Sequence, residues 1–397
     1  MTSTKHTDPQ PRQARHDDKL DPRAETIAKT TANLTSARSR NLRAIILTGS
    51  MTRNEATWVQ SGAALRVRGD AEFILVFHDK LPSDLEIGRL ELDIQCNLVA
   101  EGIECKICLS PVLPSYLVRL KPHIFGFELI SCGRVIWGDE DILSLVPPFS
   151  VGDIPLEDAC RLLSNRLIEL LEVIARSPTA EETRYNVIKL YLDMATSFLL
   201  FKGEYAPTYR ARSEQLRTLA QMSNEPWPIR STDFAETVER CTECKLNPES
   251  GEHNPPTWTD AVGSARLLWR WQLARLAGVA LTNSSDDELL KIWMRGQSIG
   301  ARLRGWAYVL RKRGWYRSWR EWPHWLRLAW RSSPRYCIYA AACNLLFAQI
   351  QFPSGLRPAW WWLPTVPKEA GNAVGAWQPT AVAIARNYHD YLEFTAA

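Results

Sequence analysis

The stretch AIILTGSMTRNEATWVQSGAALRVRGDAEFILVF, residues 44–77, contains two apolar runs that are separated by a polar segment. The first run ends at Gly49-Ser50, and the second run, Phe73 to Phe77, directly follows Asp70-Ala71-Glu72. Short apolar runs bounded by turn residues are typical of buried strands. The pattern therefore predicts a strand, a tight turn, a helix or loop, and a second strand that begins with two carboxylates.

The spacing of these two carboxylates suggests a cation site. Side chains two positions apart on a strand point to the same side, so Asp70 and Glu72 can converge on one point. Hard oxygen ligands with open positions suit Mg²⁺, which keeps several waters and shares its shell with substrate phosphates. Gly49 lets the backbone approach a phosphate closely, and Ser50 adds a hydroxyl and an N–H group at the turn.

This arrangement resembles the nucleotidyltransferase superfamily that includes DNA polymerase beta and the aminoglycoside nucleotidyltransferases. The signature of that family is a hydrophobic strand, Gly-Ser, a spacer, and Asp-x-Asp/Glu flanked by apolar residues. The spacer here is longer than is usual in the family, and Gly69 stands where serine is more typical. The residues that carry the resemblance are Gly49, Ser50, Arg53, Glu55, Asp70 and Glu72.

The resemblance implies an α+β protein with a small catalytic domain, whose mixed sheet is covered by helices, followed by a large α-helical region. It also implies transfer of a nucleoside monophosphate from a nucleoside triphosphate to a hydroxyl acceptor by Mg²⁺-dependent in-line displacement. Asp70 and Glu72 would hold the metal, while Gly49, Ser50 and Arg53 would bind the nucleotide. The acceptor and the base of the nucleotide stay open. The alternative is a catalytically degenerate relative that binds a nucleotide as a regulatory or scaffold protein.

A third carboxylate would complete such a site, and the sequence offers two candidates. Glu104 lies near the start of an expected strand at 103–109, where it can join the metal site or act as general base. Glu128 lies on an expected strand at 125–131, which Gly133-Arg134 would connect as a hairpin to a strand at 134–137. Helices are expected at 22–40 and 81–100, on either side of the first two strands.

Composition and motifs narrow the function classes. With 397 residues, 45% hydrophobic and 23% charged, the chain is long enough for two or three domains with sizeable cores. There is no apolar stretch of transmembrane length and no secretory signal, and the nine cysteines follow no framework, so a cytoplasmic protein is expected. No Walker-type P-loop, no Gly-x-Ser-x-Gly elbow and no metal-spaced histidine cluster is present.

Changes of composition along the chain predict five segments. The N-terminal residues are polar and charged, which favours disorder. From Pro155 onward, apolar residues recur at helical spacing. The expected division is a disordered tail at 1–22, a catalytic domain at 23–150, a helical domain at 151–222, a connector at 223–260, and a Trp/Arg-rich helical region at 261–397.

Three further side chains can face the nucleotide or the acceptor, namely Lys189, Tyr205 and Arg210. The simpler interpretation is that they are solvated side chains on a pair of helices. In the connector, Cys241-x-x-Cys244 lies near His253. A single CxxC lacks the four ligands of a structural zinc site, which favours two ordinary thiols over a metal site.

The C-terminal region has an unusual charge balance. Between Arg295 and Arg335 there are eleven Lys/Arg residues and one acidic residue, Glu321. This pattern is compatible with nucleic-acid binding, with contact to a membrane surface or other anionic polymer, or with a helical domain whose tryptophans are core. We expect a helical segment whose arginines form an exposed basic surface and in which most of the six tryptophans are at least half buried. The interleaved tryptophans are Trp306, Trp315, Trp319, Trp322, Trp325 and Trp330. The further run Trp360-Trp361-Trp362 lies between prolines and is expected in a loop.

Overall fold

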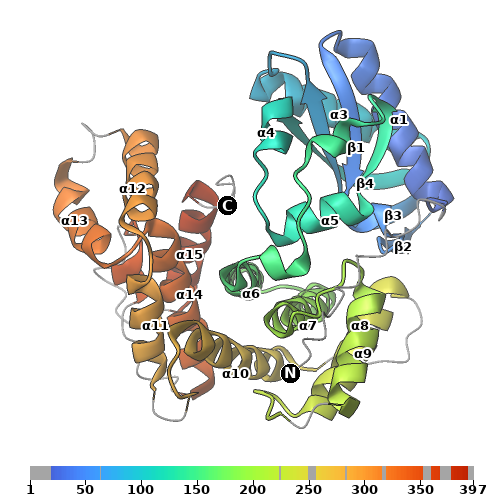
Figure 1. Ribbon diagram of the computed structural model, residues 1–397. Coiled ribbons are helices and arrows are strands. Elements are labelled where there is room, and N and C mark those ends of the chain that lie inside the picture. Colours follow the sequence, from blue (N-terminus) through green and yellow to red (C-terminus); the bar gives the residue numbers. More distant parts are fainter. Residues whose placement is uncertain are drawn as a thin grey trace, which may run out of the picture. The chain divides into compact units, whose positions relative to one another are not determined.

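The computed structural model describes residues 19–62, 64–222, 225–248, 256–281, 284–314, 319–351, 359–366 and 377–391. Most of the expected N-terminal tail, together with His253 and Trp315, lies outside this part of the chain. The fold is α+β and divides into two units (Figure 1). Unit 1 comprises Met1–Pro155, Tyr205–Arg212 and Glu243–Glu252, and unit 2 comprises the remaining segments.

A five-stranded mixed sheet forms the centre of unit 1. The long strand β3 pairs antiparallel with β1 and β2 and parallel with β4, while β5 pairs antiparallel with β1. The parallel pair is joined through a helix, as a parallel connection requires. The strands are β1 (Leu42–Thr48), β2 (Thr57–Ser61), β3 (Ala64–Phe77), β4 (Ile103–Val112) and β5 (Arg134–Gly138).

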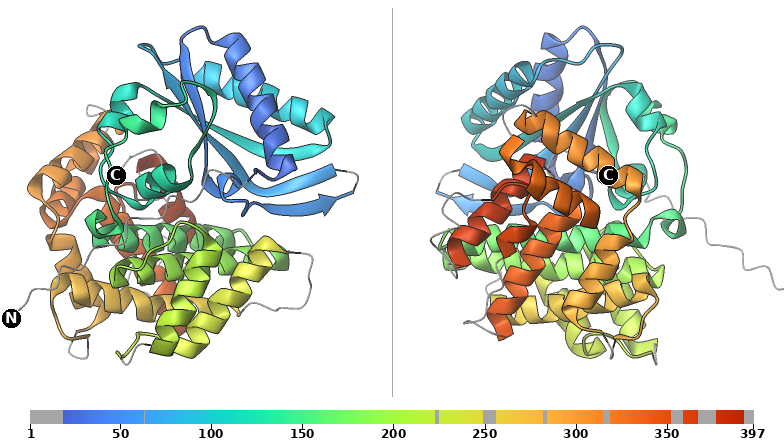
Figure 2. Two further views of the ribbon diagram at one scale, coloured as in Figure 1. Left: turned by 45° about the vertical axis from the view of Figure 1, so that its right-hand side comes forward. Right: turned by 90° about the vertical axis from the view of Figure 1, so that its left-hand side faces the viewer.

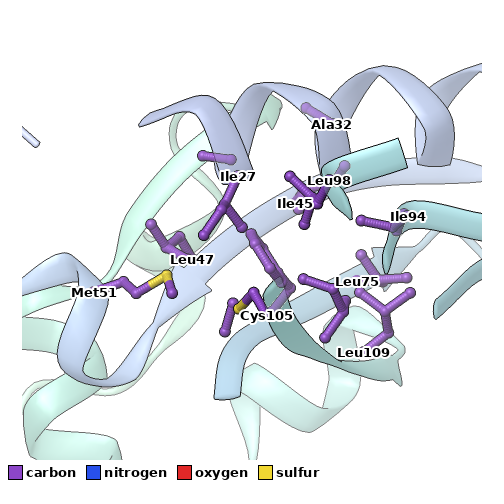
Figure 3. Close-up of a cluster of buried hydrophobic side chains, with 14 of the residues drawn as sticks. Ile27, Ala32, Ile45, Leu47, Met51, Leu75, Ile94, Leu98, Cys105 and Leu109 are labelled. Atoms are coloured by element: carbon purple, nitrogen blue, oxygen red, sulfur yellow. The ribbon is translucent and has the colours of Figure 1, made fainter. Parts of the chain in front are cut away.

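Two long helices, α1 (Pro22–Arg38) and α3 (Asp84–Ala100), cover one face of this sheet (Figure 1). Figure 3 shows Ile27 and Ala32 of α1 and Ile94 and Leu98 of α3 against residues of β1, β3 and β4. Strand β3 contributes every second residue to this core, because side chains alternate along a strand. These residues are Ala71, Phe73, Leu75 and Phe77.

The opposite face of the sheet is only partly covered. Ile46, Ile74 and Val76 pack there against α4 (Pro114–Val118) and Leu129 of α5 (Ile124–Cys132). The short helix η1 (Ile142–Leu145) adds to this cover. Asp70 and Glu72 share the face of Ile74 and Val76 by strand alternation, but they precede the covered part of β3. The sheet therefore carries two carboxylates at the end of an apolar face.

Several expected elements of unit 1 are confirmed, and two are not as expected. Helices α1 and α3 and strands β1, β4 and β5 lie where the apolar patterns placed them. Strand β3 begins at Ala64 rather than at Asp70, because its first half forms a hairpin with β2.

The expected strand at 125–131 is wrong. This segment is helix α5, which begins where His123 Nδ1 accepts a hydrogen bond from the Gly126 N–H at 2.6 Å. Gly133 ends that helix by donating its N–H to Leu129 O and does not form a hairpin turn. A short apolar run is compatible with both a strand and a buried helix. Here the hydrogen bond that His123 accepts caps and stabilises the helix.

Unit 2 is helical. Helix α6 (Leu156–Ala175) packs against α7 (Ala180–Lys202), α14 (Pro334–Gln351) and α15 (Trp377–Tyr391), and α10 (Trp258–Ala277) packs against α6, α7 and α14. The expected helices after Pro155 are thus confirmed as α6 and α7. Within the described residues, no helix combines the length and the apolar character needed to cross a bilayer. Helix α8 (Tyr209–Met222) begins in unit 1, and α9 (Ser231–Leu246) ends there. The other described helices of unit 2 are α11 (Asp286–Arg295), α12 (Ile299–Arg313), α13 (Trp322–Arg331) and the short 3-10 helices η4 (Trp319–Glu321) and η5 (Ala359–Trp362).

Candidate functional site

The Gly-Ser turn lies directly against one of the two predicted metal ligands. Strand β1 ends at Thr48, which is the register partner of Glu72 on β3, and the one-turn helix α2 (Gly49–Thr52) follows. Gly49 has φ +72°, a conformation that favours glycine. A Cβ atom at position 49 would lie 2.4 Å from Glu72 Oε2. Gly49 is therefore needed both for the turn and for the approach of the Glu72 carboxylate.

Asp70 lies two residues before Glu72 on the same face of β3. Ala71 between them is buried in the core under α1 and α3, so both carboxylates point to the other side. The register with β4 shifts between Arg66 and Asp70, and Gly69 has φ +121° within this bulge. The structure thus places Gly49 against Glu72, and Asp70 on the same face of β3 as Glu72.

A lysine outside the predicted motif lies beside Asp70. Lys106 is the register partner of Asp70 on β4, and its Nζ lies 3.9 Å from Asp70 Oδ2. Its side chain is 71% exposed, so it can move toward a bound anion. The alternation of β4 indicates this position, because every second residue of IECKICL lies on the face of Asp70.

Glu104, the first candidate for a third carboxylate, is not next to Asp70. It is the register partner of Arg66. It lies two residues before Lys106, which is a distance of about 7 Å along β4. Within the described ranges, no three His, Cys, Asp or Glu side chains come together in a way that could hold a metal ion. The position where a third carboxylate would meet Asp70 is occupied by Lys106.

Cys108 is a further neighbour of the carboxylate pair, in register with Glu72. Burial and then the negative charge of Asp70 raise the pKa of the Cys108 thiol. The thiol is therefore protonated at neutral pH and is a poor metal ligand as it stands. All nine cysteines of the chain lie in its described part and none forms a disulfide, and six of them, including Cys241 and Cys244 on α9, are buried.

Glu128, the second candidate, is engaged in a buried charge network. Arg53 Nη1 lies 2.8 Å from Glu128 Oε2, and Arg212 forms an ion pair with Glu128 Oε1. The Tyr205 hydroxyl donates a hydrogen bond of 2.6 Å to the same Oε1 atom. Arg53 Nε also lies 3.5 Å from Glu55 Oε2. We call these five residues the Glu128 network.

The network determines the protonation of its members. Burial opposes ionisation of Glu128, but Arg53 and Arg212 outweigh it and hold the pKa of this carboxyl below its usual range. Burial also raises the pKa of Tyr205 well above its usual value, with the charge of Glu128 adding to the shift. The carboxylate is thus ionised and the phenol neutral, which is the combination that satisfies two guanidinium groups.

The Glu128 network has a structural consequence for two predicted nucleotide-facing residues. The Arg53 side chain is 5% exposed and is engaged by Glu128 and Glu55, so it does not face solvent in this conformation. Tyr205 is buried in the same network. Glu55 accepts hydrogen bonds from the N–H groups of Tyr209 and Arg210 at 2.9 and 3.1 Å, and so caps the start of α8.

Of the remaining predicted residues, the Arg210 side chain is exposed, whereas Lys189 lies on α7 in unit 2. Lys189 Nζ is 5.6 Å from the ring centre of Tyr185 one turn earlier. That contact is a local cation–π pair on one helix. Lys189 is of intermediate exposure on this helix.

Substituting Gly49 by alanine tests the contact between the turn and Glu72. The added Cβ would meet Glu72 Oε2 at 2.4 Å, so the carboxylate has to rotate away from the turn. Gly102→Ala is a matched control, because Gly102 has a similar φ of +78° and open space around it. Both variants should lose about 1–2 kcal/mol of unfolding free energy from backbone strain.

Only Gly49→Ala should in addition lose Mg²⁺-dependent nucleoside triphosphate binding, measured by isothermal titration calorimetry. Equal binding by the two variants would contradict a role for this contact.

The donor set fits Mg²⁺ in a limited way. Asp70 and Glu72 offer hard carboxylate oxygens, and Mg²⁺ commonly takes one or two carboxylates and completes its shell with water and substrate phosphate. Lys106 adds a positive charge beside Asp70.

No model of a known protein family matches this chain, and no curated protein sequence matches it either.

Proposed function

We propose that the chain transfers a nucleoside monophosphate from a nucleoside triphosphate to a hydroxyl acceptor, at the site formed by Gly49, Ser50, Asp70 and Glu72. The observation that carries the proposal is the contact of the Glu72 carboxylate with Gly49, with Asp70 on the same face of β3. Two carboxylates beside a glycine turn place metal ligands next to a backbone that a phosphate can approach.

Each residue has a role that follows from its position. Asp70 and Glu72 would hold Mg²⁺, which when bound supplies positive charge for the oxygens of the reacting phosphate. The N–H groups at Gly49 and Ser50 would donate to the terminal phosphates, because no side chain at position 49 keeps them at a distance. Lys106, exposed and next to Asp70, would pair with a phosphate oxygen.

A second candidate function is nucleotide binding without transfer. The observation that favours it is the place of the two other carboxylates, since Glu128 is held by Arg53 and Arg212 and Glu104 lies beyond Lys106. Without a third carboxylate beside Asp70 and Glu72, deprotonation of the acceptor would depend on water or on the acceptor itself. A degenerate relative would then bind Mg²⁺ and nucleotide as a regulatory or scaffold protein.

One experiment separates the two functions. The purified full-length chain is incubated with Mg²⁺, cell extract and each nucleoside triphosphate labelled at the α-phosphate, and labelled products and pyrophosphate are followed. Transfer predicts a labelled acceptor that disappears with Glu72→Gln or with chelator. Label from the α-phosphate but not from the γ-phosphate distinguishes nucleotidyl transfer from kinase activity.

The second function predicts Mg²⁺-dependent nucleotide binding by calorimetry without any labelled acceptor. If the chain neither binds a nucleoside triphosphate in the presence of Mg²⁺ nor labels an acceptor, both candidate functions are wrong.

A further inference from the structure

The basic, aromatic segment 295–335 lies in unit 2, and its described part is mainly helical. Trp306 and Trp325 are buried, and their indole N–H groups donate to Ser332 O and Pro364 O at 2.9 and 2.7 Å. Trp319 and Trp330, in contrast, are 62% and 87% exposed. Trp322 is of intermediate exposure. Three of the five tryptophans that the structure describes in this segment are therefore at least half buried, as expected, and two are exposed.

Helix α12 presents an apolar strip to solvent. Ile299 is 74% exposed and Leu303 is 65% exposed, and their i, i+4 spacing places them on one side of the helix. Ala307, one turn further, is exposed on the same side. Arg304 and Arg311 are exposed beside this strip.

Helix α13 repeats the pattern. Leu326 is 70% exposed, and Trp330, four residues later, is the more exposed of the two. Arg327 and Arg331, also four residues apart, are exposed next to them. The buried side of this helix is formed by Trp325 and Leu328, so the exposed apolar residues are not its core face.

The two strips lie close together. Arg302 Nη1 of α12 donates a hydrogen bond of 3.2 Å to Trp330 O of α13, which places Trp330 by the first turns of α12. Figures 1 and 2 show the two helices side by side. We call this region the cationic apolar surface. It is formed by Ile299, Leu303, Leu326 and Trp330 with Arg304, Arg327 and Arg331.

This region carries a large excess of positive charge. From residue 299 to residue 331 the sequence has nine Lys/Arg and one acidic residue, Glu321, whose Oε1 lies 2.8 Å from Arg313 Nη2. Exposed apolar residues grouped in this way mark interaction sites rather than ordinary surface. The partner must therefore accept apolar side chains and carry negative charge.

Among anionic partners, a lipid surface fits best. Nucleic-acid bases stack on aromatic rings, but three of the four apolar side chains here are aliphatic and offer no ring. A bilayer interface accepts leucine and isoleucine into its acyl boundary, tryptophan at the headgroup level, and arginine beside anionic headgroups. We propose that the cationic apolar surface docks the chain peripherally on an anionic lipid bilayer. The proposal is independent of the function proposed for unit 1.

Vesicle co-sedimentation of the full-length chain tests this inference. Vesicles of mixed phosphatidylcholine and phosphatidylserine should bind the chain, and vesicles of phosphatidylcholine alone should bind it much less. Leu326→Ser/Trp330→Ser should weaken binding by about tenfold or more, because it removes inserted apolar area. Arg304→Gln/Arg327→Gln should weaken it by a similar factor through lost attraction to anionic headgroups.

Helix α3 offers a matched control. Leu85 and Leu92 are 64% and 62% exposed but lie on a helix with several acidic residues, so Leu85→Ser/Leu92→Ser should leave vesicle binding unchanged. Circular dichroism and thermal unfolding confirm that each variant is folded, as expected for surface positions.

Three results would overturn the proposal. The first is absence of vesicle binding, or binding that the two double variants and the α3 control affect equally. The second is salt-sensitive binding of poly-uridine, and not of vesicles, that is lost in the arginine variant, which would make the surface a nucleic-acid site. The third is a dimer, seen by analytical ultracentrifugation, that Leu326→Ser/Trp330→Ser dissociates without affecting any lipid binding.

Discussion

Replacing Asp70 with asparagine is expected to lower the rate of nucleotidyl transfer by roughly 10²–10³-fold, as for other single groups that stabilise transition-state charge. The substitution keeps the size of the side chain but removes one of the two charged oxygen ligands on β3. It should also weaken Mg²⁺-dependent nucleotide binding. Calorimetry can measure this loss of binding even if the chain catalyses no transfer. The fold should be unaffected, because the contact with Lys106 is an exposed ion pair of small energetic weight.

A suitable control is Asp79→Asn, which removes an exposed carboxylate from the loop that follows the same strand. This variant should transfer and bind nucleotide like the unmodified chain. Unchanged turnover and unchanged Mg²⁺-dependent binding in Asp70→Asn would rule out its role as a ligand.

Glu128→Gln is expected to destabilise unit 1 by about 3 kcal/mol, because it leaves two buried guanidinium groups without their shared negative charge. The Glu128 side chain is 19% exposed, and those of Arg53 and Arg212 are 5% and 4% exposed. Urea unfolding followed by circular dichroism measures the loss. The matched control is Glu25→Gln, which removes an exposed partner of Lys29 and should leave the free energy of unfolding nearly unchanged.

The same network predicts a dependence on pH. The pKa of Glu128 is lower in the folded chain than its usual value of 4.5, so the unfolded chain takes up a proton first as the pH falls. Its stabilising contribution is present above that value and is lost below it. Stability should therefore fall as the pH falls below 4.5, and it should fall less in Glu128→Gln, which has no proton to take up at this position. Equal slopes for both proteins would contradict the assignment.

The central strands could be predicted because their information is local. The apolar runs before Gly49 and after Glu72 mark β1 and the second half of β3, and the i, i+2 spacing places both carboxylates on one face. Strand β2 was missed, although TWVQS and LRVRG alternate on either side of Gly62, because the polar residues of this hairpin resemble a loop. The local pattern thus determined the candidate site but not the full length of β3.

The place of Glu128 could not be predicted in the same way. The error began with the secondary structure, since an apolar run of this length fits a strand or a short helix equally well. Its partner Arg212 lies 84 residues away, and nothing in the sequence pairs the two. Lys106 beside Asp70 depends likewise on the register between β3 and β4, including the shift at Gly69. Contacts that depend on register and on distant segments are set by packing and not by local pattern.

The discontinuity of unit 1 has a consequence for its biosynthesis. A chain is made from its N-terminus, and domains generally fold as units once they are complete. Unit 1 includes Tyr205–Arg212 and also Lys245, whose Nζ donates to Thr57 Oγ1 at 2.6 Å. The nascent polypeptide must therefore emerge from the ribosome well beyond the last strand before these contacts can form. A gene fragment that stops at Pro155 encodes the whole sheet but not the tyrosine and the arginine that complete the surroundings of Glu128.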